Sequence, residues 1–532
     1  MFRLLLVLYS LILPISCALA QQNTVIIIAD DVGTDYFGFS PDAGDTATAP
    51  HLGELARSGL VFSRAWTNPV CSPTRAGIIT GRYAFRTGVG SVITGATSPQ
   101  LDTAEMTLPR LLRDKAPVKY ATANTGKWHL HAPVPPLQRV YPNLLGYDLY
   151  SGNFNGAIPN YYNWNRILNG QLDTISVYAT TQTVNDAIAW LDTLDGTRPF
   201  FLWLAFNAPH NPYHKPPDTL ISNPGLPGTP AHISANPVLY YKAAIEAMDT
   251  EIGRLVQNID QLGLRDSTNF IFIGDNGSEA AVAQIADTVR VKGTLFEYGI
   301  HVPFFVSGPA VSAPGRTSDA LVSTADIFAT VLEMSGFGNW SSFIPSAKQP
   351  VDSRSLLPIL KNDTPRVREW IFTEQFQQPS AMRDGKTIRN EQYKLIRFDN
   401  GNERYYDLSN DPGEQLNLLN GVLTAGEALN YQFLCVSLDS LLGSSVCSFT
   451  GITETMTPTQ PRLIVMPSVT NGMVTLSCYG MLCDRIMLMD IHGKLLKTGR
   501  VGTWDLGFLE SGLYYFVAES GGRRFSAKCI KE

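Results

Sequence analysis

The sequence lacks a surplus of basic residues. Its 532 residues include 41 Lys and Arg against 47 Asp and Glu, which gives a formal net charge of -6. Nucleic acids and anionic membrane surfaces select for clustered positive charge, so we expect neither as a partner. Beyond the N-terminal segment no apolar run has the length that a bilayer-spanning helix needs. We also find no internal repeat and no low-complexity tract, and the composition is that of a globular protein.

The first 20 residues form a targeting pattern. Arg3 precedes an apolar run that ends in Ala18-Leu19-Ala20. A short apolar core followed by small residues is typical of a secretory signal, so we predict cleavage before Gln21. An uncleaved membrane anchor and a lipoprotein anchor at Cys17 are the alternatives. The short core disfavours the first, and Pro14 stands where lipoprotein signals usually have leucine.

Cysteine is scarce over most of the chain. Once Cys17 leaves with the signal, six cysteines remain, and five of them crowd into about the last hundred residues: Cys435, Cys447, Cys478, Cys483 and Cys529. Such crowding predicts disulfides in an oxidising compartment, with Cys435–Cys447 as one candidate and the connectivity otherwise open. Cys71 stands alone, far in sequence from any partner.

Apolar runs predict the main secondary structure. Five runs read as buried strands, at 24–29, 118–123, 199–206, 269–274 and 302–308. Between the third and the fourth, apolar residues from Ile245 to Leu262 repeat at helical steps until Gly263 stops the pattern. A helix that leads into a strand is half of a βαβ unit, which predicts an α/β fold with a mostly parallel sheet.

Polar segments follow the first four of these strands. They are Asp30-Asp31, "NTGKWHLH", "NAPHNPYH" and "DNGS". The carboxyl ends of parallel strands line the ligand crevice of an open sheet, so we expect these four segments to meet at one place.

Acidic residues at two strand ends predict a metal site. Adjacent carboxylates such as Asp30 and Asp31 repel each other unless a cation lies between them, and Asp275 with Asn276 supplies further oxygens. For the Asp pair alone, a turn or helix cap is an equally good interpretation. Asn-Gly is also a common hairpin turn, but the sequence that follows Asn276 does not look like a partner strand.

Cys71 is predicted to lie at a helix N-terminus. Ser72 suits an N-cap and Pro73 the first helical position. Free N–H groups there, with the cation of Arg75 one turn in, suit an anion or an activated sulfur. The alternative is an ordinary buried cysteine, which is the commoner fate of a lone thiol.

Four further residues could bind an oxyanion. Lys127 and His129 would face the same side of an extended segment. His210 lies between prolines, in a stiff loop, and Lys292 adds a cation. Each by itself is more often a solvated or capping residue than a catalyst. Together with the dicarboxylate they predict a pocket that stabilises charge on a small oxyanion.

At this point the motifs resemble those of a known family, the type I sulfatases of the alkaline-phosphatase-like fold. "CSPTRAGIITG" fits the family's signature of Cys, any residue, Pro, Ser or Thr, Arg, four variable residues, Ser or Thr, and Gly. "GKWHL", "APHNP", "GDNG" and "KGTLFEYGIHVP" resemble its other blocks and occur in the same order. The resemblance covers about residues 22 to 420.

The resemblance implies a chemistry for Cys71. In the family a maturation enzyme oxidises this cysteine before folding to Cα-formylglycine, whose hydrate attacks sulfur, forms an enzyme sulfate and then releases sulfate. It also implies one Ca²⁺, held by Asp30, Asp31, Asp275, Asn276 and modified Cys71. Arg75, Lys127, His129, His210 and Lys292 would stabilise the hydrate, bind sulfate oxygens and protonate the leaving alcohol. Either His210 or Lys292 would be that acid.

Some positions depart from the family pattern. Tyr298 and His301 replace the first glycine and the arginine of a Gly-Gly-Ile-Arg block, and His131 stands where a glycine is usual. We expect these departures to affect substrate preference. Ser151 and His301 are candidate substrate contacts.

The resemblance also predicts how the chain divides into domains. After the signal peptide (1–20) we expect a catalytic domain over 21–365 and a small antiparallel α+β subdomain with a linker over 366–450. Residues 460–532 read as short strands and resemble the C-terminal sorting domain of the Bacteroidota type IX secretion system, a β-sandwich-like domain. An ordinary carbohydrate-binding or immunoglobulin-like appendage is the alternative. We therefore expect a secreted or cell-surface protein, with the periplasm as the alternative.

The leading hypothesis is a secreted sulfatase that acts on sulfated polysaccharide or aryl sulfate. A phosphodiesterase or phosphonate monoester hydrolase of the same superfamily is the nearest alternative. A surface-displayed binding protein without catalysis is the third.

Overall fold

The computed structural model describes residues 22–132, 139–377 and 380–443, and residues 462–531 with short gaps. The predicted signal peptide and residues 444–461, which include the end of the subdomain and linker predicted over 366–450, lie outside the described residues. The chain divides into two compact units, residues 1–446 and 447–532. Within the described residues no helix is long and apolar enough to cross a bilayer.

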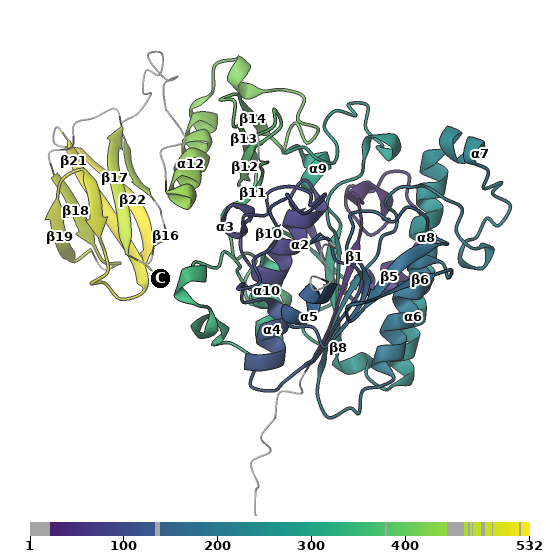
Figure 1. Ribbon diagram of the computed structural model, residues 1–532. Helices are drawn as coiled ribbons and strands as arrows, with labels where there is room; N and C mark the ends of the chain where they lie inside the picture. The colour runs from purple at the N-terminus through teal and green to yellow at the C-terminus, as the bar shows by residue number, and fades with distance from the viewer. Residues whose placement is uncertain are drawn as a thin grey trace, which may run out of the picture. The chain divides into compact units, whose positions relative to one another are not determined.

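A ten-stranded sheet runs through the large unit, in the order β10-β2-β9-β8-β1-β7-β3-β4-β5-β6 (Figure 1). The strands from β2 to β4 in this order are parallel except β9, and β5 and β6 continue the sheet in antiparallel pairs. This is the mostly parallel sheet that the sequence predicts. The strands are β1 (Asn23–Ala29), β2 (Gly59–Trp66), β3 (Ala121–Lys127), β4 (Leu149–Asn153), β5 (Trp164–Leu168), β6 (Gln171–Ile175), β7 (Phe200–Ala205), β8 (Thr268–Gly274), β9 (Phe304–Ser307) and β10 (Arg316–Ser323).

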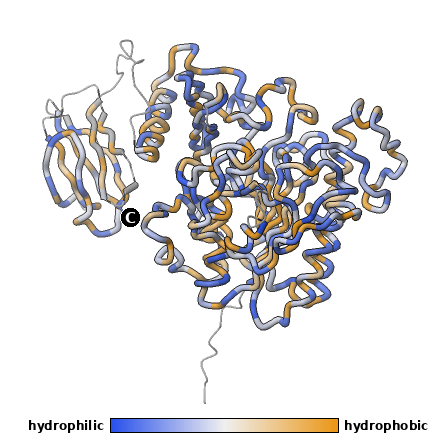
Figure 2. The backbone as a smooth tube through the Cα atoms, viewed as in Figure 1, coloured by the Kyte–Doolittle hydropathy of each residue, from blue (hydrophilic) through white to orange (hydrophobic). Residues whose placement is uncertain are grey.

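Helices cover both faces of this sheet. Alternate residues of β1 enter two different cores, Val25 and Ile27 on one face and Ile26 and Ile28 on the other. The first face is covered by α1 (Pro50–Arg57), α6 (Ala179–Leu191) and α8 (Pro237–Gln261), and the second by α2 (Cys71–Thr80), α4 (Leu108–Arg110), α10 (Asp326–Met334) and α11 (Leu357–Leu360). Hydrophobic segments accordingly gather in the middle of the large unit (Figure 2). The large unit also contains four short helices, α3 (Ala84–Thr87), α5 (Tyr141–Leu144), α7 (Pro230–Ala235) and α9 (Glu297–Ile300).

The sequence located α8 well and β3 poorly. The predicted helix is α8, which starts with Pro237 at its first position and ends before Gly263, whose φ of 70° suits glycine. The strand predicted at 118–123 is wrong in its bounds, because β3 starts later and continues through Lys127. Apolar content marked the wrong residues, since the polar end of β3 is also fully buried.

A smaller antiparallel sheet belongs to the same unit. Its strands β11 (Ile371–Gln375), β12 (Gly385–Arg389), β13 (Tyr393–Phe398) and β14 (Glu403–Asp407) pair in sequence order, and α12 (Ala425–Leu442) contacts β12 and β13. This matches the small antiparallel subdomain expected after residue 366. Cys435 in α12 is disulfide-bonded, and its candidate partner Cys447 lies outside the described residues.

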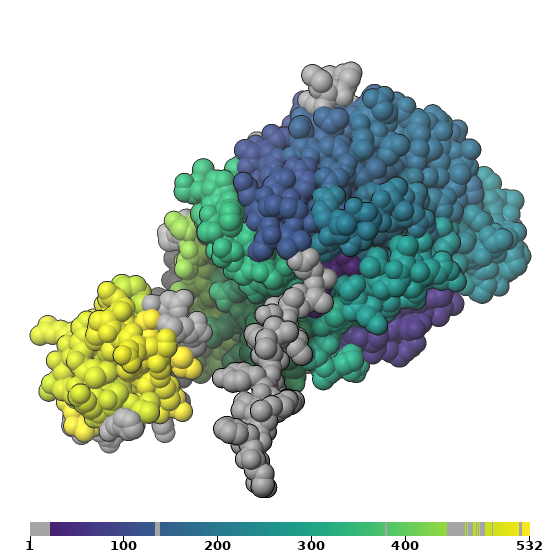
Figure 3. Space-filling model, turned by 90° about the horizontal axis from the view of Figure 1, so that it is seen from below, coloured from purple at the N-terminus to yellow at the C-terminus, as the bar shows by residue number. Residues whose placement is uncertain are grey.

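The small unit is built from strands alone within its described residues. They form one sheet of three strands and one of five around a separate apolar core. In Figure 3 the colours of the small unit are those of the C-terminal part of the chain alone. The surface of the large unit combines segments from many parts of the sequence. Cys478 and Cys483 form a disulfide, and Cys529 is a free, buried thiol. The strands are β15 (Arg462–Met466), β16 (Val469–Thr470), β17 (Met473–Tyr479), β18 (Arg485–Met489), β19 (Leu495–Gly499), β20 (Gly502–Asp505), β21 (Gly512–Ser520) and β22 (Arg523–Lys531).

Candidate active site

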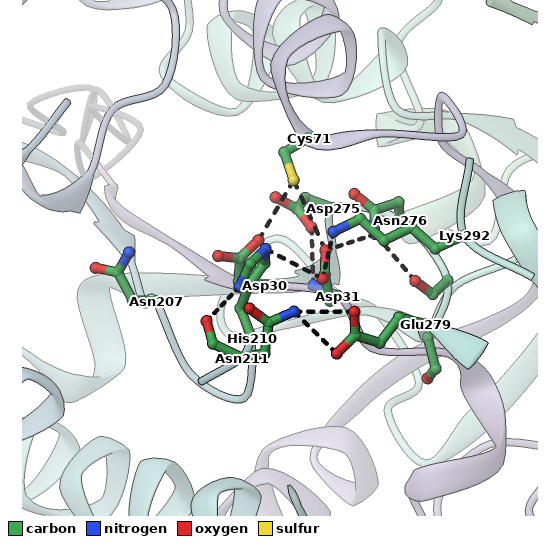
Figure 4. A network of polar contacts seen from close by, with 12 residues as sticks. Asp30, Asp31, Cys71, Asn207, His210, Asn211, Asp275, Asn276, Glu279 and Lys292 are labelled. Atoms are coloured by element: carbon green, nitrogen blue, oxygen red, sulfur yellow. Dashed lines mark hydrogen bonds and ion pairs between the residues drawn. The ribbon is translucent and has the colours of Figure 1, made fainter. Parts of the chain in front are cut away.

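The carboxyl ends of four neighbouring parallel strands meet beside the start of α2. Asp30 and Asp31 follow β1, Lys127 ends β3, His210 follows β7 and Asp275 follows β8. Figure 4 shows most of these side chains converging below the sulfur of Cys71. The predicted meeting of the strand-end segments is therefore present in the structure.

Helix α2 presents Cys71 as its first residue. Its N-cap is Val70, so the helix starts earlier than Ser72 and Pro73 predicted. The Ser72 hydroxyl is not a cap, because it accepts a hydrogen bond from the backbone N–H of Ile93 (3.2 Å). Cys71 is nevertheless at the helix N-terminus, where free N–H groups favour negative charge.

The sulfur of Cys71 lies among charged groups. Its Sγ is 3.5 Å from Asp30 Oδ1, 3.7 Å from Asp31 Oδ1 and 3.5 Å from Lys127 Nζ. Burial, with the nearby charge of Asp275, raises the pKa of the Cys71 thiol well above its usual value. Without a metal cation beside it, the unmodified thiol therefore stays protonated.

Each carboxylate of the cluster has a cationic partner, which is buried for Asp30 and Asp275 and partly exposed for Asp31. Lys127 Nζ donates to both oxygens of Asp30 (2.7 and 2.6 Å), and Arg75 donates to Asp275 Oδ2 through Nε (3.0 Å) and Nη2 (2.8 Å). Lys292 Nζ donates to Asp31 Oδ2. Three carboxylates thus face three fixed cations inside the protein.

Burial and charge act in opposite directions on these carboxylates. Burial raises the pKa of Asp30 to about 6, although Lys127 opposes it. For Asp31 burial has the same effect, but the charges of His210, Lys292 and Lys127 outweigh it and hold its pKa below the usual range. Arg75 does the same for Asp275. Asp31 and Asp275 are therefore ionised under ordinary conditions.

The donor set fits a hard divalent cation. One ligand atom each from Asp30, Asp31, Cys71 and Asp275 lie within 4.8 Å of one another. The amide nitrogen of Asn276 donates to Asp31 Oδ1 (2.9 Å), while its Oδ1 is buried and has no hydrogen-bond partner. A buried oxygen without a partner is costly unless a cation or water binds it. Oxygen donors from two strand ends are what Ca²⁺ prefers.

Two histidines lie at this site in different ways. His129 has a φ of 55°, so the extended segment predicted for Lys127 and His129 is wrong there. Its Nε2 faces the carbonyl of Ile93 (3.2 Å) and its Nδ1 is buried without a partner. Burial, with Lys127 and Arg75, holds the pKa of His129 well below its usual value. His210 has Nε2 3.4 Å from Asp31 Oδ2 and Nδ1 2.6 Å from the carbonyl of Asn211.

Ser151 and His301 do not join the cluster. The hydroxyl of Ser151 donates to Asp186 Oδ2 in α6 (2.6 Å), because β4 turns this side chain toward the helix layer. His301 lines a separate cavity of about 630 Å³, with Asp35, Tyr298 and Arg389 among its walls, and no residue of the cluster lines it. His131, another departure from the family pattern, stacks on Trp128 and Tyr141.

Tyr161 and Glu279 are contacts that the sequence did not indicate. The hydroxyl of Tyr161 lies 2.6 Å from the carbonyl of Asn207 and 2.8 Å from that of His210, and Glu279 binds Asn211. Both come from loops far from His210 in sequence, and no spacing or motif links them to it.

Comparisons with known proteins agree with this geometry. The sulfatase family matches residues 22–337, and the family described as N-sulphoglucosamine sulphohydrolase, C-terminal, matches residues 290–427. N-acetylgalactosamine-6-sulfatase of Mus musculus is 27% identical over 391 residues, which cover 67% of this chain and 70% of that protein. The ulvan-active sulfatase of Formosa agariphila is 27% identical over 422 residues, covering 75% of this chain and 77% of that protein.

Solved structures share the fold. Ps i-CgsB in complex with k-i-k-neocarrahexaose aligns with a TM-score of 0.67 at 24% identity. The alignment covers 79% of this chain and 92% of the Ps i-CgsB chain. BT4656 in complex with its substrate D-glucosamine-2-N,6-O-disulfate has a TM-score of 0.62 at 20% identity, covering 80% and 98%.

Proposed function

The chain belongs to the sulfatase family, and from that premise we propose that it hydrolyses sulfate esters of glycans through a formylglycine made from Cys71, with Ca²⁺ beside it. The observation that carries the proposal is the setting of Cys71, which is 1% exposed at the start of α2 and within contact of two carboxylates and one ammonium. A structural cysteine has no need of such neighbours.

Position 71 needs modification to act in this setting. Its thiol is held protonated, whereas a hydrated formylglycine there would supply the oxygen nucleophile that attacks sulfur. The buried, unpartnered Nδ1 of His129 supports the same interpretation. Since Nε2 faces a carbonyl, which only accepts, Nε2 carries the proton and Nδ1 presents a lone pair that can accept a hydrogen bond from the hydrate.

The metal would be held by Asp30, Asp31, Asp275 and Asn276, where it would supply positive charge next to the reacting oxygens. Without it the charges of the carboxylates (-3) and of Arg75, Lys127 and Lys292 (+3) cancel. A divalent cation would leave the site with a net charge of +2, which favours binding of a sulfate ester over water.

The leaving alcohol needs a proton donor. His210 and Lys292 both contact Asp31 and both keep some exposure, 12% and 18% of their side chains. Either can therefore reach a bound ester from the outer side of the cluster.

A second cavity supports a carbohydrate as the leaving group. It has about 240 Å³ and is lined by Gly90, Ser91, Val92, Thr94, Thr97, Ser98, Pro99, Phe376 and Gln377. Hydroxyls, an amide and an aromatic ring, with no charge among these residues, suit an uncharged sugar ring. Ile93 in the same loop contacts both Ser72 and His129, so this loop reaches the cluster, although no residue of the cluster lines the cavity. The names of the relatives, which include an N-acetylgalactosamine-6-sulfatase and an ulvan-active sulfatase, support a glycan substrate.

We propose export for the protein on the strength of the signal pattern at 1–20 and the strand-rich C-terminal region, with type IX secretion as the route. The test is to fractionate the native host and to compare the full chain with one that ends at residue 446. Retention of the full chain in the cytoplasm would contradict export, and surface delivery of the shortened chain would contradict type IX sorting.

The central test is mass analysis of the peptide Ala65–Arg75 from protein made with the maturation enzyme. Formylglycine at position 71 replaces one sulfur and two hydrogens by one oxygen. The modified protein should turn over aryl sulfate faster than aryl phosphate, and Cys71→Ala should abolish this activity. Cys529→Ala removes the other free thiol among the described residues, and this variant should retain the activity. An unmodified thiol in active protein, or faster phosphate turnover, would refute the proposal.

A further inference from the structure

Glu279 joins the loop that follows β8, which carries Asp275 and Asn276, to the loop that carries His210. It follows β8 in the segment that contains Asp275 and Asn276, and its carboxylate faces the loop of His210 (Figure 4). Asn211 Nδ2 lies 3.0 Å from Glu279 Oε1 and 2.9 Å from Oε2, and the hydroxyl of Tyr213 also donates to Oε1. One carboxylate thus holds residues on both sides of Pro212.

The segment around Glu279 is itself well anchored. Ser278 Oγ accepts a hydrogen bond from the backbone N–H of Gly33 (3.0 Å), next to the metal-binding aspartates. The hydroxyl of Tyr36 donates to the carbonyl of Val282. Glu279 is therefore held on both sides by the loop that follows β1, and it can act as a fixed support.

The position of the His210 imidazole depends on the loop that contains Asn211 and Tyr213. Its Nδ1 lies 2.6 Å from the carbonyl of Asn211, the residue whose side chain Glu279 binds. The other side of the loop is held by Tyr161, whose hydroxyl contacts the carbonyls of Asn207 and His210. The backbone N–H of Asp30 also donates to the carbonyl of Ala208 (3.1 Å). Loss of Glu279 would therefore release one of several supports and leave the loop folded.

We propose that Glu279 is a positioning residue, which fixes His210 next to Asp31 by binding Asn211 and Tyr213. This inference rests on the proposed function, because it gives His210 a part in the reaction. A carboxylate suits the task, since it accepts hydrogen bonds from two donors at once. Burial and the charge of Glu279 raise the pKa of Tyr213, so its hydroxyl stays a donor.

The kinetic test compares two esters that differ in their need for an acid. Phenyl sulfate has a poor leaving group and 4-nitrophenyl sulfate a good one, although their shapes are similar. With His210 misplaced, Glu279→Gln should lower kcat for phenyl sulfate about tenfold more than for the nitrophenyl ester, with little change in KM. Tyr213→Phe should act in the same direction, and the double variant should lose less than the product of the two single losses.

Glu251→Gln is the matched control. Glu251 is also a carboxylate with two donors, Thr181 and Arg254, but it lies in α8, away from the cluster. It should lower the rate of both esters equally or not at all. Equal losses for both esters in Glu279→Gln would overturn the inference.

A second measurement does not depend on activity. Hydrogen exchange of residues 207–214, followed by mass spectrometry, should become faster in Glu279→Gln and stay unchanged in Glu251→Gln. Unchanged exchange in both variants would refute the positioning role. If the matured wild-type protein hydrolyses neither sulfate ester, the proposed function is wrong, and the exchange measurement still decides whether Glu279 holds the loop.

Discussion

Replacing Glu374 by glutamine should stabilise the large unit at alkaline pH. Glu374 lies in β11, where its Oε1 accepts a hydrogen bond from the backbone N–H of Phe85 (2.7 Å) and its carbonyl accepts one from Asn68 Nδ2 (3.0 Å). These bonds join the small sheet to both ends of the segment that contains α2. The side chain is fully buried, and burial raises the pKa of Glu374 from 4.5 to about 7.

The sign of the effect follows from proton binding. Below pH 4.5 both the folded and the unfolded chain hold the proton, so ionisation of Glu374 has no effect on stability. Between pH 4.5 and about 7 the unfolded chain loses the proton first, and folding becomes less favourable as the pH rises. Above pH 7 the loss is complete, and the interval from 4.5 to 7 corresponds to about 3 kcal/mol.

The assay is urea unfolding of the wild type and of Glu374→Gln at about pH 5 and about pH 8. Glutamine keeps the acceptor for Phe85 and does not ionise, so the free energy of unfolding of the variant should exceed that of the wild type by about 2 kcal/mol more at pH 8 than at pH 5. Glu391→Gln removes an exposed carboxylate that pairs with Arg366, and it should not change this pH dependence. An equal difference at both pH values would refute the reasoning.

Three further predictions concern the site. Lys127→Met leaves the charge of Asp30 buried without its ammonium partner. In the presence of chelator this variant should lower the free energy of unfolding by about 3–5 kcal/mol, and it should abolish turnover. A loss of stability below about 1 kcal/mol would contradict the ion pair. Removing Ca²⁺ should lower the stability of the wild type by about 2.7 kcal/mol relative to a free concentration one hundred times Kd, as thermal melts with chelator and added Ca²⁺ would measure; identical melts would argue against the metal site. Phe376→Ala should reduce kcat/KM for a sulfated oligosaccharide more than for 4-nitrophenyl sulfate, because its ring lines the uncharged cavity; equal reductions would exclude a sugar contact there.

Local patterns were sufficient for much of the fold. The apolar run at 24–29 and the three- and four-residue steps from Ile245 onward correspond to β1 and α8, since burial on both faces and burial on one face leave different periods in the sequence. β3 was misplaced because the sheet buries the polar residues that end it, and burial by tertiary contact leaves no apolar signal.

The candidate site shows the same division. Rules for strand ends in parallel sheets predict that Asp30, Lys127, His210 and Asp275 meet, because the carboxyl ends of neighbouring strands share one edge. The contact of Ser151 could not be predicted, since strand β4 directs its hydroxyl to Asp186, and only the packing of α6 decides that.

The sequence by itself determined which polar residues follow each strand and which cysteine belongs to the signature. Both are local patterns of residue type and spacing. Only the tertiary structure decided the partners: Lys127 with Asp30, Arg75 with Asp275, Lys292 with Asp31 and Glu279 with Asn211. These pairs join residues from separate loops and strand ends, and such contacts follow from packing in three dimensions rather than from any spacing along the chain.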